Sequence, residues 1–138
     1  MLEKVSEVAK KLSETDLEAV CLNNIQQHEE ELLDMNRAQL QDSVNRDFEP
    51  LGFYKTLRYA EMKGRETVDL RLTGDFYNAM HIEATEFPVF FRSKDEKTGF
   101  LVARYGREIF GLTAPNIGIL KQNIIIPACV EAINDALL

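Results

Sequence analysis

Carboxylates and two histidines are the side chains of this 138-residue chain whose types allow catalysis or metal binding. Asp69, Asp75 and Glu83 follow one another within a short stretch, and carboxylates serve nucleases as general bases and as ligands of divalent cations. His28 and His81 lie far apart, and neither has a second ligand at helical metal-ligand spacing. Carboxylate pairs arise by chance in a chain this acidic. We therefore expect no catalytic residue, no metal site and no cofactor, and rank a metal-dependent nuclease third among the functional hypotheses.

A second group of residues combines cations with aromatic rings, a composition that can bind phosphates and stack bases. Its members are Tyr54, Lys55, Arg58, Tyr59, Lys63, Arg65 and Arg71. The alternative, which we favour, is that these cations balance acidic groups within the same protein or across a subunit contact. No glycine-rich phosphate loop accompanies the cluster.

Charge is distributed unevenly along the sequence. The formal net charge is −7, which argues against a broad phosphate-binding face and against an anionic membrane as the main partner. Residues 1–50 carry 5 Lys or Arg against 12 Asp or Glu, whereas residues 51–138 carry 11 against 11. The acidic excess predicts a solvated helix face, or a surface that meets a basic partner or repels DNA passing close by.

The cysteines and the lengths of the apolar runs indicate in which cellular compartment the protein resides. Cys21 and Cys129 both lie among apolar residues in predicted helices, which favours reduced thiols over a disulfide. No apolar run is long enough for a signal peptide or a membrane span. We expect a soluble protein that is made in the cytoplasm and is not exported from the cell that makes it.

Apolar periodicity predicts an N-terminal helical part over residues 1–43, with one helix over 2–12 and a second from Thr15 to about 36–41. Thr15 and Glu18 have the spacing of a capping box. A connector, residues 44–64, follows. Its aromatic and apolar residues are expected to pin the connector to the core: Phe48, Leu51, Phe53 and Tyr54.

The remainder, residues 65–138, predicts a small sheet and a C-terminal helix. Short helices are expected over 56–63 and 76–80, and strands over 82–85, 89–93 and 100–105. Thr113, Ala114 and Pro115 begin a helix that continues to Leu138 and is kinked at Pro127. The predicted fold class is α+β, a single domain over 1–138 with a two- to four-stranded antiparallel sheet.

Two segments flank the predicted hairpin and carry a resemblance. Asp69-Leu70-Arg71-Leu72-Thr73-Gly74-Asp75-Phe76-Tyr77 precedes the strands, and Tyr105-Gly106-Arg107-Glu108-Ile109-Phe110-Gly111-Leu112-Thr113 leads into the last helix. The pattern resembles the tailed-phage virion-morphogenesis family, which includes head–tail connector and tail-completion proteins. It departs from the commoner pattern where Phe76 and Tyr77 replace small or basic residues. The resemblance marks nine candidate structural or interface residues: Thr73, Gly74, Phe76, Tyr77, Tyr105, Arg107, Phe110, Gly111 and Leu112.

The resemblance implies a structural subunit of the virion that is made in the host cytoplasm and lies at the neck or tail-completion position. Its partners would be portal, connector and tail proteins, in a ring of identical subunits, with a non-sticking contact to passing DNA and no membrane. The second hypothesis is a small protein-binding or regulatory module that uses the C-terminal helix kinked at Pro127.

Overall fold

Three helices form the N-terminal third of the chain. The computed structural model describes residues 2–71 and 73–138, and it begins with α1 (Leu2–Glu14), α2 (Leu17–Gln27) and α3 (Glu29–Gln41). The predicted second helix is thus interrupted at His28. The predicted Thr15 capping box is also wrong, because Asp16 caps α2 by accepting a 3.0 Å hydrogen bond from Ala19 N–H.

The connector is a loop that ends in a short helix, as predicted. α4 (Leu57–Lys63) is capped by the Thr56 hydroxyl, which accepts from Tyr59 N–H at 3.2 Å, and it ends at Gly64 with φ +75°. The expectation that four residues pin this connector to the core is half right. Leu51 and Tyr54 pack against the core, but Phe48 and Phe53 are 61% and 72% exposed.

The sheet has two antiparallel strands among the described residues, within the predicted range. α5 (Asp75–Asn78) leads into β1 (Met80–Glu83), which pairs with β2 (Phe90–Ser93) so that Met80 faces Ser93 and Glu83 faces Phe90. The strand predicted over 100–105 is wrong, since these residues belong to α6 (Thr98–Tyr105). A short apolar run suits either a strand or a helix, and here the side chains facing the core follow a helical spacing.

The C-terminal helix is long, as predicted, and irregular just before its proline. Arg107–Ile109 forms the 3₁₀ turn η1, and the long helix runs through α7 (Ala114–Leu120), the π-helical η2 (Lys121–Ile125) and α8 (Ile126–Leu137). Pro127 has no N–H to donate to the Asn123 carbonyl. The π-helical turn lies where that hydrogen bond is lost. The kink expected at Pro127 stays a prediction.

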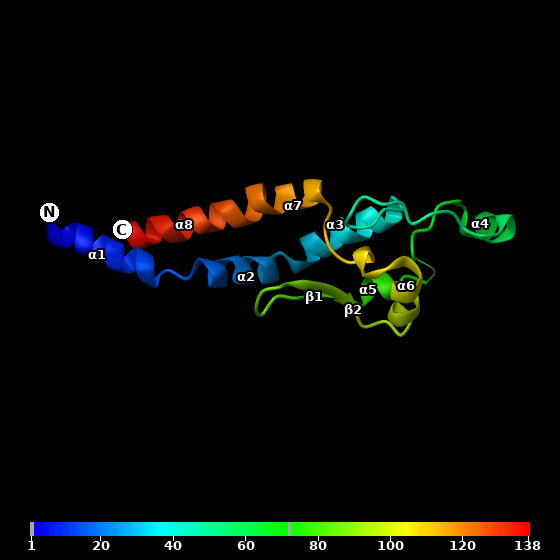
Figure 1. Cartoon of the computed structure of the whole chain (residues 1–138), viewed down its shortest axis with the longest axis horizontal. Coiled ribbons are helices and arrows are strands. Elements are labelled where there is room, and N and C mark those ends of the chain that lie inside the picture. Colours follow the sequence, from blue (N-terminus) through cyan, green and yellow to red (C-terminus); the bar gives the residue numbers. More distant parts are fainter. Residues whose placement is uncertain (1, 72) are drawn as a thin grey trace.

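The molecule is elongated, with two ends of different character (Figure 1). One end is a helical arm made of α1, α2, α7, η2 and α8, and both chain termini lie at its tip. The other end holds α4, α5 and α6, and the hairpin β1–β2 lies along the region of α2 and α3. No helix in the described part of the chain has the length and apolar character needed to cross a membrane.

Two groups of buried side chains hold these parts together. The larger group unites α3, the segment before α5, α5 itself and the turn after α6, around Leu33, Leu40, Phe76 and Phe110. The smaller one joins α2, α3, the hairpin and η2. The core therefore lies under the middle of the molecule and leaves the tip of the arm outside it.

Candidate functional site

The two segments that carry the family resemblance meet in the core. Phe76 of α5 and Phe110 after η1 are both buried, with ring centroids 5.7 Å apart, and the Tyr77 ring lies 6.3 Å from Phe76. Leu72, also part of the first segment, lies outside the described residues. The segments are thus one packing unit, although residues 78–104 separate them in the sequence.

Burial divides the nine candidate residues into two classes. Five are buried and belong to the framework: Gly74, Phe76, Tyr77, Phe110 and Leu112. Four reach the surface at least in part: Thr73, Tyr105, Arg107 and Gly111. At Gly111, where φ is +114°, an added Cβ would lie 3.0 Å from Arg46 Cδ, so backbone and space both favour glycine.

Two amides of α3 hold the second segment in place, and the sequence reading missed both. Asn36 Nδ2 donates to the Ile109 carbonyl at 2.9 Å, and its Oδ1 accepts from Gly111 N–H at 3.0 Å. Gln39 Nε2 donates to the Gly111 carbonyl at 2.9 Å, while its Oε1 accepts from Thr113 N–H at 2.9 Å. Both side chains are buried. α3 therefore fixes the path of the chain into α7.

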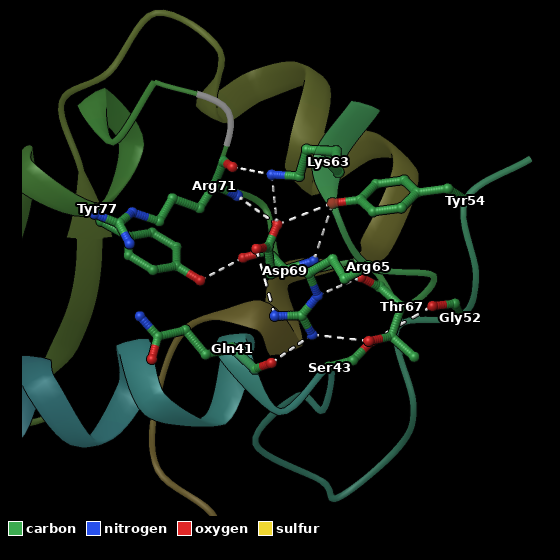
Figure 2. Close-up of polar contacts among 10 residues, drawn as sticks. All are labelled: Gln41, Ser43, Gly52, Tyr54, Lys63, Arg65, Thr67, Asp69, Arg71 and Tyr77. Atoms are coloured by element: carbon green, nitrogen blue, oxygen red, sulfur yellow. Dashed lines mark hydrogen bonds and ion pairs between the residues drawn. The ribbon is translucent and has the colours of Figure 1, made fainter. Parts of the chain in front are cut away.

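A buried carboxylate, that of Asp69, is the centre of a second polar network (Figure 2). Asp69 Oδ1 lies 3.0 Å from Lys63 Nζ and accepts from the Tyr54 hydroxyl at 2.9 Å, and Oδ2 lies 3.5 Å from Arg65 Nη1. The Arg71 backbone N–H donates to Oδ1 at 3.0 Å. We name the side chains of Tyr54, Lys63, Arg65 and Asp69 the Asp69 cluster. It ties the connector and α4 to the segment before α5.

The Asp69 cluster changes the proton affinities of its members. Burial acts to raise the pKa of Asp69, but hydrogen bonds from the Arg71 N–H, Lys63 and Tyr54 outweigh it, so this pKa lies below its ordinary value. Burial, followed by the hydrogen bond to Asp69, raises the pKa of Tyr54 to about 12. The pKa of Tyr77 is also raised, first by burial and then by the charge of Asp69. Asp69 is thus charged, and both Tyr54 of the cluster and the neighbouring Tyr77 are neutral.

A groove of about 380 Å³ opens beside the Asp69 cluster, between the connector, α4, α5 and α6. Six aromatic rings line it: Phe53, Tyr54, Tyr59, Phe76, Phe100 and Tyr105. Five cations line it as well: Lys55, Lys63, Arg71, Lys97 and Arg104. No carboxylate belongs to this lining in the described chain. Its volume falls in the range of ~300–1,000 Å³ that ligand pockets occupy. We call it the aromatic groove.

The basic cluster read from the sequence is divided between two roles. Lys63 and Arg65 pair with Asp69, which is the internal charge balance that we favoured. Lys55 and Arg71 line the aromatic groove, and no carboxylate oxygen lies within 4.0 Å of their cationic nitrogens among residues 2–71 and 73–138. Arg58 is exposed on α4. Two of the five cations are therefore structural, and three are exposed.

The three carboxylates considered for a nuclease do not form one site. Asp69 is enclosed by cations, Glu83 on β1 accepts from Arg92 Nε at 2.9 Å, and Asp75 is exposed at the start of α5. No group of three or more metal-ligating His, Cys, Asp or Glu residues occurs among the described residues. His28 lies at the break between α2 and α3, and its Nδ1 lies 2.9 Å from the Asn24 carbonyl oxygen.

The helical arm contrasts with these sites because it leaves large apolar side chains uncovered. α1, α7 and α8 contain no buried residue in the described structure. Large apolar side chains stand exposed along them, among them Leu2, Val5, Ile126, Val130 and Leu137. Within the arm, α2 and α8 approach so closely that Cys21 Sγ and Cys129 Sγ are 3.8 Å apart.

Comparison of the chain with protein-family models, with curated proteins and with solved structures finds no match.

Proposed function

We propose that this chain is a structural subunit of a tailed phage or prophage particle, at the head–tail neck or the tail-completion position. In this role it works by self-association and by docking to portal, connector and tail proteins. The observation that carries the proposal is the uncovered apolar surface of the helical arm. The resemblance of the two segments around the hairpin supports the neck or tail-completion position that we propose.

The apolar surface of the arm supports assembly over a monomeric role. Soluble monomers rarely expose large contiguous apolar patches, and such patches usually mark contacts between proteins. α1 and α8 are both amphipathic and pack on each other at the tip of the arm, yet Leu2, Val5, Val130 and Leu137 remain exposed. A neighbouring subunit that covers these side chains would complete a core that one copy leaves open.

The framework around α3 supports the same role. A subunit in a ring needs a body that holds its contact surfaces in fixed positions. Asn36 and Gln39 fix the segment 109–113, and Asp69 fixes the connector and α4. Buried polar networks that are fully satisfied rigidify a fold in this way.

The acidic excess of residues 1–50 bears on the contact with DNA. Part of it pairs within the chain, since Glu30 and Asp34 lie beside Arg37 at the surface, and Glu29 accepts from Ile82 N–H. The exposed carboxylates of Glu18 on α2 and Glu31 on α3 remain. In a ring around DNA, these charges would repel the phosphates and let the duplex slide.

Inactivation of the gene in the phage that encodes the chain tests the proposal. We expect particles arrested at head–tail joining, with DNA-filled heads and separate tails by electron microscopy. The wild-type chain supplied from a plasmid should restore complete particles. A matched pair of complementing variants then tests the arm: Val130→Asp, on its apolar surface, should fail, whereas Glu131→Asp should succeed. Complete, infectious particles without the chain would refute the proposal.

A further inference from the structure

The aromatic groove lacks the internal partners that its composition calls for. Phe100 of α6 and Phe53 of the connector stand 66% and 72% exposed at the groove, although phenylalanine usually lies inside. Lys55 and Arg104 also line it, and no carboxylate of the described chain lies within 4.0 Å of their cationic nitrogens. The groove therefore fits a ligand that combines an apolar ring with negative charge.

The same chain displays such a ligand on its connector. Phe48 is 61% exposed and stands between two exposed carboxylates, Asp47 and Glu49. None of these three residues lines the groove of its own chain in the described structure. We call residues 47–49 the acidic knob.

Backbone hydrogen bonds preform the acidic knob. Asn45 Oδ1 accepts from Asp47 N–H at 2.9 Å and from Glu49 N–H at 3.0 Å, and Asn45 N–H donates to the Glu49 carbonyl at 2.9 Å. Phe48 has φ +63°, which is a rare conformation for a bulky residue, and its side chain gains little burial in return. The turn thus presents an aromatic ring that is 61% exposed, in a backbone conformation that costs energy.

We propose that the acidic knob of one copy docks in the aromatic groove of a second copy. The Phe48 ring enters between Phe53 and Phe100, and the carboxylates of Asp47 and Glu49 meet the cations at the rim. The two surfaces are complementary in charge and residue type: the acidic knob carries two carboxylates beside an aromatic ring, and the groove lining holds rings and cations but no carboxylate in the described chain. This inference rests on the self-association proposed above and names one of its contacts.

A contact of this kind is heterologous, because the knob and the groove are different surfaces of the same chain. Each copy then keeps one free knob or one free groove, so that association continues until a ring closes. Single-stranded nucleic acid is the competing occupant, since rings and cations also bind bases and phosphates. The net charge of −7 opposes its approach, and the knob supplies a nearer match.

Complementary variants test the contact in the full-length chain by sedimentation velocity. Phe48→Asn removes the knob ring, and asparagine tolerates the left-handed backbone of this turn. Phe100→Gln removes a groove ring and keeps a good helix former in α6. Each variant alone should self-associate about 10-fold more weakly or worse. An equimolar mixture should form a 1:1 complex through the one working knob and groove, and this contact should not extend it further, since the second knob and the second groove are both disabled.

A charge exchange tests the electrostatic half of the contact. Glu49→Lys and Lys55→Glu should each weaken self-association, and their mixture should restore it because a basic knob meets an acidified groove. Met62→Gln and Glu31→Lys are matched controls, since both side chains are exposed and lie outside the knob and the groove lining. Both controls should associate like the wild type, and circular dichroism should show all variants folded.

Three outcomes overturn the inference. Equal association of wild type, Phe48→Asn and Phe100→Gln would move the contact to another surface such as the helical arm, and would leave the proposed virion role intact. No complex in the mixtures and no wild-type self-association up to about 1 mM would exclude the knob-and-groove contact. Salt-dependent binding of oligo-dT that Phe100→Gln abolishes and Phe48→Asn does not, without self-association, would assign the groove to nucleic acid.

Discussion

The side chain of Asn36 binds the backbone on both sides of Phe110. Its Nδ2 donates to the Ile109 carbonyl at 2.9 Å, and its Oδ1 accepts from Gly111 N–H at 3.0 Å. Asn36 is fully buried, so that no water replaces either bond from the solvent. One residue of α3 thereby positions the segment that leads into the C-terminal helix.

Replacement of Asn36 by alanine should lower the free energy of unfolding by about 3 kcal/mol. Two buried backbone groups would lose their partners, at about 1–3 kcal/mol each. Urea unfolding followed by circular dichroism measures the change. Asn23→Ala is the control, because Asn23 is exposed on α2. A loss no larger than that of the control would mean that the Ile109 and Gly111 backbone groups find other partners.

The sequence does contain a signal for Asn36. A polar side chain stands where the helical pattern calls for an apolar one. Leu32, Asn36, Gln39 and Leu40 all lie on the apolar stripe of α3, where the amides interrupt the pattern of leucines. Amides on such a stripe indicate buried hydrogen bonds, because a buried polar group needs a partner. The partner itself is not predictable from this pattern, since it lies more than seventy residues away.

Replacement of Asp69 by asparagine should cost about 3 kcal/mol of stability at neutral pH. The variant leaves the buried Lys63 ammonium and the Arg65 guanidinium without their anion, and breaking one half of a buried pair costs ~3–5 kcal/mol. Thr67 and Gln41 oxygens still bind Arg65, which favours the lower end of that range. Asp135→Asn, at an exposed position of α8, is the matched control for urea unfolding.

The contribution of Asp69 to the free energy of unfolding should also depend on pH. Its pKa is depressed in the folded chain, so its stabilisation is complete above the ordinary value of 3.8 and is lost as the pH falls through the lower folded value. The difference in unfolding free energy between wild type and Asp69→Asn should therefore shrink in acid. A difference that stays constant down to the acid transition would show that the charge of Asp69 contributes nothing.

The raised pKa of Tyr54 predicts that the folded chain loses stability at alkaline pH. Its folded pKa is raised to about 12 from an ordinary value of 10.0, so its contribution is complete below pH 10 and is lost as the pH rises toward 12. Titration of tyrosinate absorbance should include a group that ionises near pH 12. This group should disappear in Tyr54→Phe, which keeps the ring and removes the hydroxyl. An unchanged high-pH titration in the variant would assign the late ionisation elsewhere.

The connector and α4 show which features could be predicted from neighbouring residues in the sequence and which could not. Periodicity and turn residues predicted α4 and its Gly64 end, because caps and glycines act within a few residues. Phe48 and Phe53 were expected inside because aromatic rings usually are, and they lie outside because the connector turns both away from the core. Whether Lys63 and Arg65 pair within the chain depends on the position of Asp69, and tertiary contacts set that position.

Cys21 and Cys129 should form a disulfide under mild oxidation, although both are free in this structure. Their Sγ atoms are 3.8 Å apart across α2 and α8, and a disulfide requires about 2.05 Å, so a small movement suffices. Burial raises the pKa of Cys21, and the reaction should accelerate as the pH rises and thiolate accumulates. Oxidised glutathione accepts the two electrons and leaves as two thiols, while the protein loses two thiol protons.

The bond would close a loop between residues 108 positions apart, and a loop of that size stabilises by about 5 kcal/mol in the chain-entropy model. We therefore expect a higher unfolding midpoint after oxidation, a mass lower by two hydrogens and no free thiol. Cys21→Ser is the control and should show none of these changes. If the oxidised wild type instead forms disulfide-linked dimers, α2 and α8 do not pack against each other as the helical arm requires.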